Sequence, residues 1–502
     1  EVKRIVYENL EKKYGTKVHP LILKRVEQEL QIIINNKFAP IYYISYILVQ
    51  KSVNDGYIVG SRGSVGSSFI ATLLQITEVN PIRPHYYCEN KDFTVLKFSK
   101  AEIEEYGITE EEKAFQAYFE NIKSGYDLPN MCCPICGGKL YKDGHDIPFE
   151  TFIGFSGEKV PDIDLNFSGD YQAVAHAYVR ELLGEDYTFR AGTIQKVQER
   201  NAFGYVKGYL EDKNLDLRKA QVDRLARKIQ GVKRSSGQHP GGIVVVPKDY
   251  SIFDVTPIQY PADDVNADWK TTHFDYDSFS DNLLKLDILG HDNPTILKFL
   301  MDYVHKHQEN FDFKHIDDIP LDDQEVYKMF QGNKVLGINA TDLDCDVATY
   351  GIPEFGTPFV RHMLCDTKPD SFSGLVKISG LSHGKNVWLN NGQALIKGEW
   401  ENVEKVSFDN IIACRDDIMV VLTNEYHLEP IDAFNIMEFI RKGKPSEDPK
   451  KWLEHIELMR KYNIPEWYIK SAGLINYLFP KAHATAYVIV AMRIAWFKLY
   501  QP

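Results

Sequence analysis

Two aspartates separated by one residue are the clearest sign of chemistry in this sequence. Asp162 and Asp164 flank Ile163 in the run PDIDLNF at residues 161–167. Because alternate side chains of a strand share a face, we expect both carboxylates to point the same way while Ile163 faces the core. Two like charges this close favour a cation between them, and hard divalent ions prefer oxygen ligands. An exposed strand with a polar face is the simpler alternative for the pair taken alone.

A third carboxylate, Asp287, lies in the strand-like run LLKLDILG at residues 283–290. The alternation puts Lys285 and Asp287 on one face, and a solvated strand face is again the alternative. Three strand-borne aspartates fit a site for two divalent ions near a triphosphate, where one ion activates a hydroxyl and the other neutralises the leaving phosphate. An Asp-x-Asp pair also occurs in sugar-nucleotide transferases, so these residues do not identify the acceptor.

A glycine- and serine-rich loop, GSRGSVGSS at residues 60–68, follows a predicted short strand at 55–59 and precedes a predicted helix at 69–76. Glycines let the backbone approach an anion, and a helix N-terminus offers unpaired N–H groups, so this order predicts a phosphate site. Arg62 would clamp phosphate oxygens with its rigid donor fork. The loop matches neither the Walker A nor the Rossmann pattern, and a turn with a packing role is the alternative.

Near the C-terminus, FPKAHATAY at residues 479–487 opens an apolar helix. His483 and Tyr487 are one helical turn apart and share a face, and Lys481 lies in the first turn. A cation, an imidazole and an aromatic ring gathered there would suit phosphates and a base. A core helix with an ordinary histidine is the alternative.

A cysteine knuckle, CPICGG at residues 133–138, presents the thiols of Cys133 and Cys136 on a tight turn suited to zinc. Tetrahedral closure needs two more ligands, and Cys88, His85 and Cys132 are the candidates. Seven cysteines in 502 residues do not make a disulfide scaffold, so we expect a reducing cytoplasm.

The length of 502 residues predicts about three domains. Residues 1–52 are expected to be helical, 81–147 to be an irregular insertion, and 152–166 to be strand-like. Residues 171–230 should be mainly helical, 241–246 a buried strand, and helices should dominate from 292 onward. The chain opens with Glu1 and stops in an apolar, helix-like run, so we expect a piece of a longer protein.

The net charge of the chain and the charge of residues 196–234 point to opposite conclusions about a nucleic-acid partner. A net charge of -13 argues weakly against one, yet residues 196–234 hold 11 Lys and Arg against 5 Asp and Glu. A solvated helical face is the alternative for that stretch. No apolar run reaches the roughly 20 residues of a membrane helix, so no membrane partner is expected.

Five motifs in order make the sequence similar to the PolC-type alpha subunit of bacterial DNA polymerase III. They are GYIVGSRGSVGSS at 56–68, PDIDLNFSG at 161–169, GQHPGG at 237–242, KLDILGHD at 285–292 and FPKAHA at 479–484. The resemblance implies an α/β palm of the polymerase-beta-like nucleotidyltransferase type with mainly α-helical thumb and fingers. It implies a palm at 1–193 and 242–300, with residues 81–147 inserted, a thumb at 194–241 and fingers at 301–502.

The resemblance also assigns roles to residues. It implies metal-binding, catalytic carboxylates at Asp162, Asp164 and Asp287; nucleotide contacts at Gly60, Ser61, Arg62, Ser64, Arg415, Lys481 and His483; and DNA contacts at Arg200, Lys233, Arg234, Arg441 and Lys442. Two Mg²⁺ ions are the implied cofactors, with one structural Zn²⁺ at Cys88, Cys133 and Cys136. The family usually has paired Cys-x-x-Cys knuckles, whereas Lys91 breaks the first one here, so four-thiolate zinc is not expected.

The implied activity is that of a DNA-directed DNA polymerase that adds dNTPs to the 3′-hydroxyl of a primer on template DNA. For full-length relatives the resemblance adds the sliding clamp and other replisome subunits as partners, and a cytoplasmic, nucleoid-associated location. The family's exonuclease and clamp-binding segments have no counterpart in this sequence, so neither function is assigned. A sugar-nucleotide transferase and a non-catalytic nucleic-acid scaffold are the rival interpretations.

Overall fold

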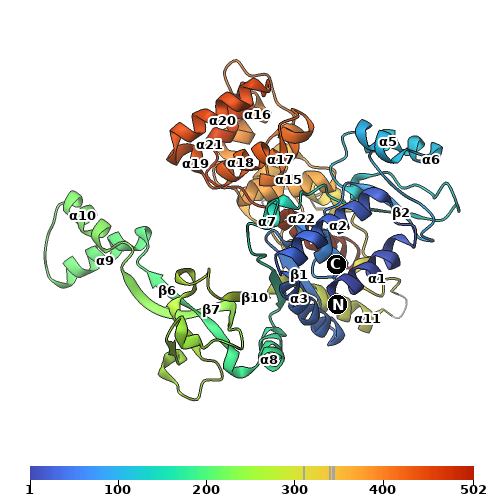
Figure 1. The fold of residues 1–502 in the computed structure, drawn as a ribbon. Coiled ribbons are helices and arrows are strands. Elements are labelled where there is room, and N and C mark those ends of the chain that lie inside the picture. The colour runs from blue at the N-terminus through green and yellow to red at the C-terminus, as the bar shows by residue number, and fades with distance from the viewer. Residues whose placement is uncertain (309–310, 339–340, 342–344) are drawn as a thin grey trace. The chain divides into compact units, whose positions relative to one another are not determined.

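The computed structural model describes residues 1–308, 311–338, 341 and 345–502, which form two compact units (Figure 1). Unit 1 comprises Glu1–Ser168 and His291–Pro502, and unit 2 comprises Gly169–Gly290. The chain leaves unit 1 after Ser168 and returns at His291, so unit 2 is an insertion in sequence. The boundaries of palm, thumb and fingers stay predictions, because compactness alone does not identify those domains.

Three helices begin unit 1 and confirm the expected helical start: α1 (Val2–Tyr14), α2 (Pro20–Asn35) and α3 (Ala39–Asn54). Helix α2 has proline in its first turn and buries Ile22, Val26, Leu30 and Ile33 along one stripe. Within the described residues, no single helix is long and apolar enough to cross a membrane; α2 and α3 reach that length only as a pair bent by 110°.

A two-stranded antiparallel pair carries the first two sequence motifs. Strand β1 (Val59–Arg62) runs against β5 (Asp164–Ser168); the short helix α4 (Phe69–Leu73) follows β1, and the short helix α7 (Glu150–Ile153) precedes β5. The predicted helix after the glycine loop is confirmed in α4. The predicted strand at 152–166 was mostly wrong, because buried residues at its start form α7, which ends at Ile153 and is followed by Gly154 with φ of 85°.

Residues 81–147 are more regular than the sequence suggested. Strands β2 (His85–Cys88), β3 (Thr94–Leu96) and β4 (Leu140–Asp143) form an antiparallel sheet in the order β3-β2-β4, accompanied by α5 (Lys100–Tyr106) and α6 (Glu110–Phe115). This segment has its own hydrophobic core, which includes Tyr86, Phe93, Phe115 and Leu140. The expected irregularity was therefore wrong, because strands of three and four residues are too short to show a clear alternation; that the segment is an insertion stays a prediction.

Helices dominate unit 1 from residue 292, as predicted. They are α11 (Asp292–His307), α12 (Gln324–Gln331), α14 (Pro358–Thr367), α15 (Phe372–His383), α16 (Gln393–Lys397), α17 (Arg415–Asn424), α18 (Pro430–Arg441), α19 (Lys444–Glu447), α20 (Pro449–Lys461), α21 (Glu466–Leu474) and α22 (Lys481–Tyr500). Every residue of α22 from Ala482 to Phe497 is buried, so it is a central helix, apolar on nearly all sides.

Unit 2 contains a five-stranded mixed sheet in the order β10-β7-β6-β9-β8. Its elements are α8 (Gln172–Leu183), β6 (Thr188–Lys196), α9 (Glu199–Asp212), α10 (Lys219–Ile229), β7 (Lys233–Val245), β8 (Ile258–Gln259), β9 (Thr271–Asp275) and β10 (Leu284–His291). Strands β6 and β9 are parallel, and the other pairs are antiparallel. The helices predicted within 171–230 are present, but strand β6 among them was missed.

A helical hairpin joins the long strands β6 and β7. Figure 1 shows α9 and α10 side by side beyond the ends of these strands. Their contact buries Ala202, Val206, Leu210, Val222 and Ala226, which form a core separate from that of the sheet. The hairpin therefore holds its two helices together largely by its own apolar residues.

Candidate active site

The Asp162–Asp164 pair lies where the sequence placed it, at the start of β5. Asp164 is the first residue of the strand, and Asp162 precedes it by two positions. Ile163, Leu165 and Phe167 are buried, so the alternate positions face the other way. Carboxylate oxygens of the two aspartates lie within 4.8 Å of each other, close enough to share one divalent ion.

The glycine loop meets this pair through strand pairing. Arg62 pairs with Asp164 and Gly60 with Asn166 in the antiparallel register of β1 and β5. Gly63 follows with φ of 70°, and a Cβ atom there would lie 3.3 Å from Asp164 Oδ2. A glycine is favoured at this turn both by the left-handed backbone and by the close carboxylate.

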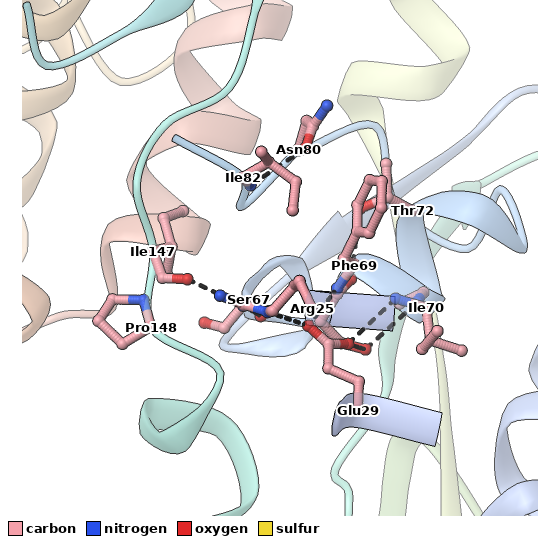
Figure 2. Close-up of polar contacts among 12 residues, drawn as sticks. Arg25, Glu29, Ser67, Phe69, Ile70, Thr72, Asn80, Ile82, Ile147 and Pro148 are labelled. Carbon is pink, nitrogen blue, oxygen red and sulfur yellow. Dashed lines mark hydrogen bonds and ion pairs between the residues drawn. The ribbon is translucent and has the colours of Figure 1, made fainter. Parts of the chain in front are cut away.

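The N-terminus of α4 does not serve as an anion site, contrary to the sequence expectation. Figure 2 shows the Glu29 carboxylate accepting the backbone N–H groups of Phe69 and Ile70, at 3.0 and 3.1 Å. Arg25 Nε donates to Glu29 Oε1, and its Nη2 donates to the carbonyl oxygens of Ser67 and Ile147. Glu29 is fully buried, so an internal carboxylate already occupies the positive end of the helix.

The side chains of the loop differ in what they offer a substrate. Ser61 is buried, and its hydroxyl forms a 2.7 Å hydrogen bond with Thr77 Oγ1. Arg62, Gly63 and Ser64 are half-buried. Arg62 is therefore the positively charged group of the loop that stays within reach of solvent.

His483 on α22 touches the loop directly. Its Nδ1 accepts the backbone N–H of Gly63 at 3.1 Å, and its ring stacks on Tyr487 with centroids 4.4 Å apart. Burial, together with the nearby charges of His383, Arg62 and His291, lowers the pKa of His483 to about 3. The imidazole is thus neutral near pH 7, and its Nδ1 is held as an acceptor.

A second histidine behind His483 has the opposite character. His383, at the end of α15, places its ring centroid 5.5 Å from that of His483. Its Nε2 lies 2.9 Å from Glu354 Oε2, and its Nδ1 lies 2.7 Å from the carbonyl oxygen of Ser379. Burial opposes protonation, but the hydrogen bonds to Glu354 and Ser379 outweigh it and raise the pKa of His383.

Lys481 and Arg415, both expected at the nucleotide, are engaged inside the protein. Lys481 Nζ donates to the carbonyl oxygen of His145 at 2.6 Å, and its backbone N–H donates to Asp416 Oδ2 at 2.7 Å. Arg415 is 5% exposed, and its Nη2 donates to the carbonyl oxygen of Thr151 at 2.8 Å. Burial lowers the pKa of Arg415. A nucleotide would have to compete with these internal acceptors.

Arg441 and Lys442, expected on DNA, share one carboxylate of α18. Arg441 Nε lies 2.5 Å from Glu438 Oε1, and Lys442 Nζ lies 3.2 Å from Glu438 Oε2. Burial alone would raise the pKa of Glu438, but Arg441 and Lys159 lower it to about 2. The carboxylate therefore offsets part of the positive charge of this segment.

Asp287 belongs to unit 2 and is buried, not solvated as a polar strand face would be. It is 5% exposed on β10, opposite Gly242 of β7. Lys285 Nζ lies 2.8 Å from Asp287 Oδ2, as their shared face predicted, and His239 Nδ1 lies 3.6 Å from Oδ1. Within the described residues, Oδ1 has no hydrogen-bond partner. A buried carboxylate oxygen without a hydrogen bond is suited to binding a cation.

The GQHPGG motif explains how His239 is held beside Asp287. His239 Nδ1 accepts the backbone N–H of Gly242 at 2.7 Å, and Arg190 Nη2 donates to the carbonyl oxygens of His239 and Pro240. No role was predicted for this motif from the sequence. Its only local signal was the pair of glycines after His-Pro, which allows a ring nitrogen to approach the backbone.

Exposed positive charge collects on the hairpin of α9 and α10 and the start of β7. All 11 Lys and Arg of residues 196–234 are exposed, including Arg200, Lys233 and Arg234. The Arg234 guanidinium lies 5.8 Å from the ring centroid of Tyr205, which is itself exposed. This surface has the charge that phosphate backbones attract.

Comparison with known proteins decides the family. The model of the bacterial DNA polymerase III alpha NTPase domain matches residues 1–213 and 204–290, and that of the alpha subunit finger domain matches 293–463. The chain belongs to the bacterial DNA polymerase III alpha subunit family. The resemblance drawn from the five motifs is thereby confirmed.

Relatives named DNA polymerase III PolC-type extend this similarity over the whole chain. Those of Oceanobacillus iheyensis and Staphylococcus aureus are 51% identical over 504 residues, and that of Halalkalibacterium halodurans is 52% identical over 506 residues. Each alignment covers 100% of this chain and 32% of the relative. The chain thus spans about a third of the length of these relatives.

The cysteine cluster of this family member has three thiols. Sulfur atoms of Cys88, Cys133 and Cys136 all lie within 4.8 Å of one another. Burial raises the pKa of Cys88 to about 11, whereas a hydrogen bond from Asn90 lowers that of Cys136. Among the described residues, no further Cys, His, Asp or Glu joins the group.

Two of the other candidate zinc ligands fall outside this cluster. His85 was a wrong candidate: its Nε2 lies 2.9 Å from the Tyr14 hydroxyl, and its Nδ1 lies 2.7 Å from the carbonyl oxygen of Arg83. On β2 it is three residues before Cys88 and so faces the opposite side. Cys132 is exposed and lies outside the group as well.

Proposed function

We propose that this chain is the core of a DNA-templated DNA polymerase of bacterial chromosome replication. It would add dNTPs to a primer 3′-hydroxyl and release pyrophosphate. The observation that carries this proposal is the Asp162–Asp164 pair beside Arg62 and Gly63, in a chain of the polymerase III alpha family. The polymerase-beta-like palm, the thumb and the fingers, with the boundaries given above, are part of the same proposal.

The carboxylates Asp162, Asp164 and Asp287 are the ligands that we propose for two Mg²⁺ ions. The first two share a face of unit 1, and the third is buried in unit 2 with one oxygen that lacks a hydrogen bond among the described residues. Bound Mg²⁺ would supply activation of the primer hydroxyl and neutralisation of the leaving pyrophosphate. Lys285 already holds one oxygen of Asp287, so the chain itself fixes the orientation of that carboxylate.

Arg62 and His483 are the side chains that we propose to meet the triphosphate, next to the backbone of Gly60, Ser61 and Ser64. Arg62 brings a permanent positive charge in a planar donor fork. His483 stays neutral, so it would orient the loop through the Gly63 N–H without adding charge. Lys481 and Arg415 would join only after they leave their present carbonyl acceptors.

Template and primer are the partners that we propose for the exposed basic surface. Arg200, Lys233 and Arg234 would grip the duplex backbone from the hairpin of unit 2, because exposed lysines and arginines gain by releasing counterions from DNA. Arg441 and Lys442 would add contacts from α18 and the residue after it. For the longer protein we propose the sliding clamp and other replisome subunits as partners, and a nucleoid location.

A binding and extension assay tests the polymerase proposal. The chain is given a primer–template, Mg²⁺ and each dNTP in turn, and a second primer that ends in a dideoxynucleotide isolates binding from chemistry. We expect template-directed extension, and we expect only the complementary dNTP to tighten the complex with the blocked primer. Turnover of nucleotide sugars with no dNTP-dependent tightening would favour the transferase instead.

We also propose that Cys88, Cys133 and Cys136 hold one structural Zn²⁺. Zinc favours thiolate ligands, and the clustered sulfurs and the lowered pKa of Cys136 fit such a site. Metal analysis of the purified chain should find about one zinc per molecule and nearly none in Cys136→Ser. Cys365→Ser, which changes a half-buried thiol outside the cluster, is the control. Equal zinc in both variants would contradict the site.

A further inference from the structure

The hydroxyl of Tyr487 lies at a meeting point of four segments of unit 1. Arg62 Nη2 of the glycine loop donates to it at 3.0 Å, and Asn166 Nδ2 of β5 donates at 3.4 Å. His291 Nε2, at the N-cap of α11, lies 3.3 Å away. Tyr487 itself belongs to α22, so one phenol oxygen connects the loop, the carboxylate strand and two helices.

This arrangement leaves the hydroxyl no capacity for a substrate. A tyrosine hydroxyl offers one proton and two lone pairs, and three nitrogen atoms already surround this one. Tyr487 is 4% exposed, and its ring is covered on one side by the stacked ring of His483. The sequence suggested that Tyr487 meets a base, whereas its polar atom is used within the protein.

Arg62 depends on this contact. Within the residues that the structure describes, its guanidinium makes one hydrogen bond, and that bond goes to Tyr487. The side chain is half-buried and has many rotamers, so a single anchor decides much of its orientation. The next residue, Gly63, is tied to α22 in the same way, through His483 one turn earlier.

We propose that Tyr487 is a positioning residue whose hydroxyl holds Arg62 ready for the triphosphate of the incoming nucleotide. The inference rests on the proposed polymerase function and adds a role that acts through Arg62. Helix α22 then sets the loop by two contacts, from His483 to the backbone and from Tyr487 to the guanidinium. Without the hydroxyl, Arg62 samples other rotamers, and the nucleotide must order it on binding.

The test is a double-substitution cycle that reads nucleotide binding. Tyr487→Phe removes only the hydroxyl, and Arg62→Ala removes the group on which it acts. The dissociation constant of the complementary dNTP is measured with Mg²⁺ and a dideoxy-terminated primer–template. A lost hydrogen bond to a charged group predicts about a tenfold weaker dNTP complex for Tyr487→Phe. In the Arg62→Ala background the same change should have no further effect.

Tyr500→Phe is the matched control, because it removes a phenol hydroxyl from the same helix, where the partner is Asp323 at 2.9 Å. It should leave dNTP binding unchanged. Equal losses from Tyr487→Phe with and without Arg62 would overturn the proposal, since the hydroxyl would then act independently. So would an unchanged dissociation constant in Tyr487→Phe with a normal melting temperature. No dNTP binding by the unaltered chain would instead contradict the polymerase function itself.

Discussion

The glycine loop and the hairpin of unit 2, both positively charged, are built in opposite ways. Around the glycine loop, Arg62 is bound by Tyr487, Gly63 by His483, and both partners are buried on α22. On the hairpin of unit 2, the basic side chains are all exposed, and the apolar core beneath them is small. The first region fixes positions by specific hydrogen bonds from buried side chains, while the second exposes positive charge to solvent.

Under the proposed polymerase function, each region would suit a different task. A triphosphate must be held in one geometry, which favours preorganised donors. A duplex must be gripped at any sequence and released for movement, which favours exposed charge and counterion release. Binding to the first region should thus be sensitive to single atoms, and binding to the second should be sensitive to salt.

Among the binding experiments, the largest effect is expected from the hairpin. Lys233→Ala combined with Arg234→Ala should weaken primer–template binding about 50-fold near 0.1 M salt. The slope of log K against log salt should become shallower by about 1.8, because each lost phosphate contact contributes about 0.9. The control, Lys97→Ala with Lys100→Ala, removes two exposed charges from unit 1. Titrations from 50 to about 300 mM salt measure both. A slope equal to that of the unaltered chain would exclude this surface as the DNA grip.

A smaller, salt-independent effect is expected at His483. His483→Phe keeps a ring for stacking but removes the acceptor of the Gly63 N–H, so dNTP binding should weaken about tenfold. His483→Asn is the matched rescue, because its Oδ1 can accept in place of Nδ1. The dissociation constants are read with a blocked primer at two salt concentrations. If the loss in His483→Phe varied with salt as the hairpin variant does, the contrast between the regions would fail.

The smallest effect concerns the two neighbouring histidines and pH. The pKa of His383 is raised, so its pairing with Glu354 stabilises the fold below about pH 6.5 and this stability disappears as pH rises through the folded pKa. Glu354→Gln should then lower the free energy of unfolding by about 1 kcal/mol near pH 5.5 and by less near pH 9. Thermal unfolding across this range measures it.

The pH dependence of stability that His483 contributes has the opposite sign. Its folded pKa of about 3 lies below the unfolded value, so acid favours the unfolded state from about pH 6.5 downward. The His483→Asn variant, which cannot titrate there, should lose less stability than the unaltered chain between pH 6.5 and pH 4. Equal acid sensitivity of the two would show that His483 is not held neutral.

The sequence predicted what depends on local periodicity. The face shared by Asp162 and Asp164, the face shared by Lys285 and Asp287, and the helical character of residues 1–52 follow from spacings of two or about 3.6 residues. The strand β6 was missed because its flanking helices dominate the pattern. Long-range contacts were not predicted at all.

Glu29 illustrates why long-range contacts are not predicted from local spacing. Nothing near it in α2 indicates that its carboxylate will cap a helix that begins 40 residues later. The same holds for Lys481, whose spacing suggested a phosphate contact although its ammonium group binds the carbonyl oxygen of His145. These contacts depend on which segments meet in space, and a single sequence records that only weakly. Cys133 and Cys136 were found through their Cys-x-x-Cys spacing, whereas Cys88 was one of three candidate partners among which the sequence did not choose.

Primer extension by Asp164→Asn tests whether this carboxylate holds a catalytic metal ion. Asparagine keeps the size of the side chain but removes the charge that a divalent ion requires, so extension should fall by at least about a thousandfold while the melting temperature changes little. Asp186→Asn, an exposed aspartate of unit 2, is the control and should extend primers like the unaltered chain. Extension by Asp164→Asn at nearly the rate of the unaltered chain would contradict the proposal that Asp164 binds a catalytic Mg²⁺ ion.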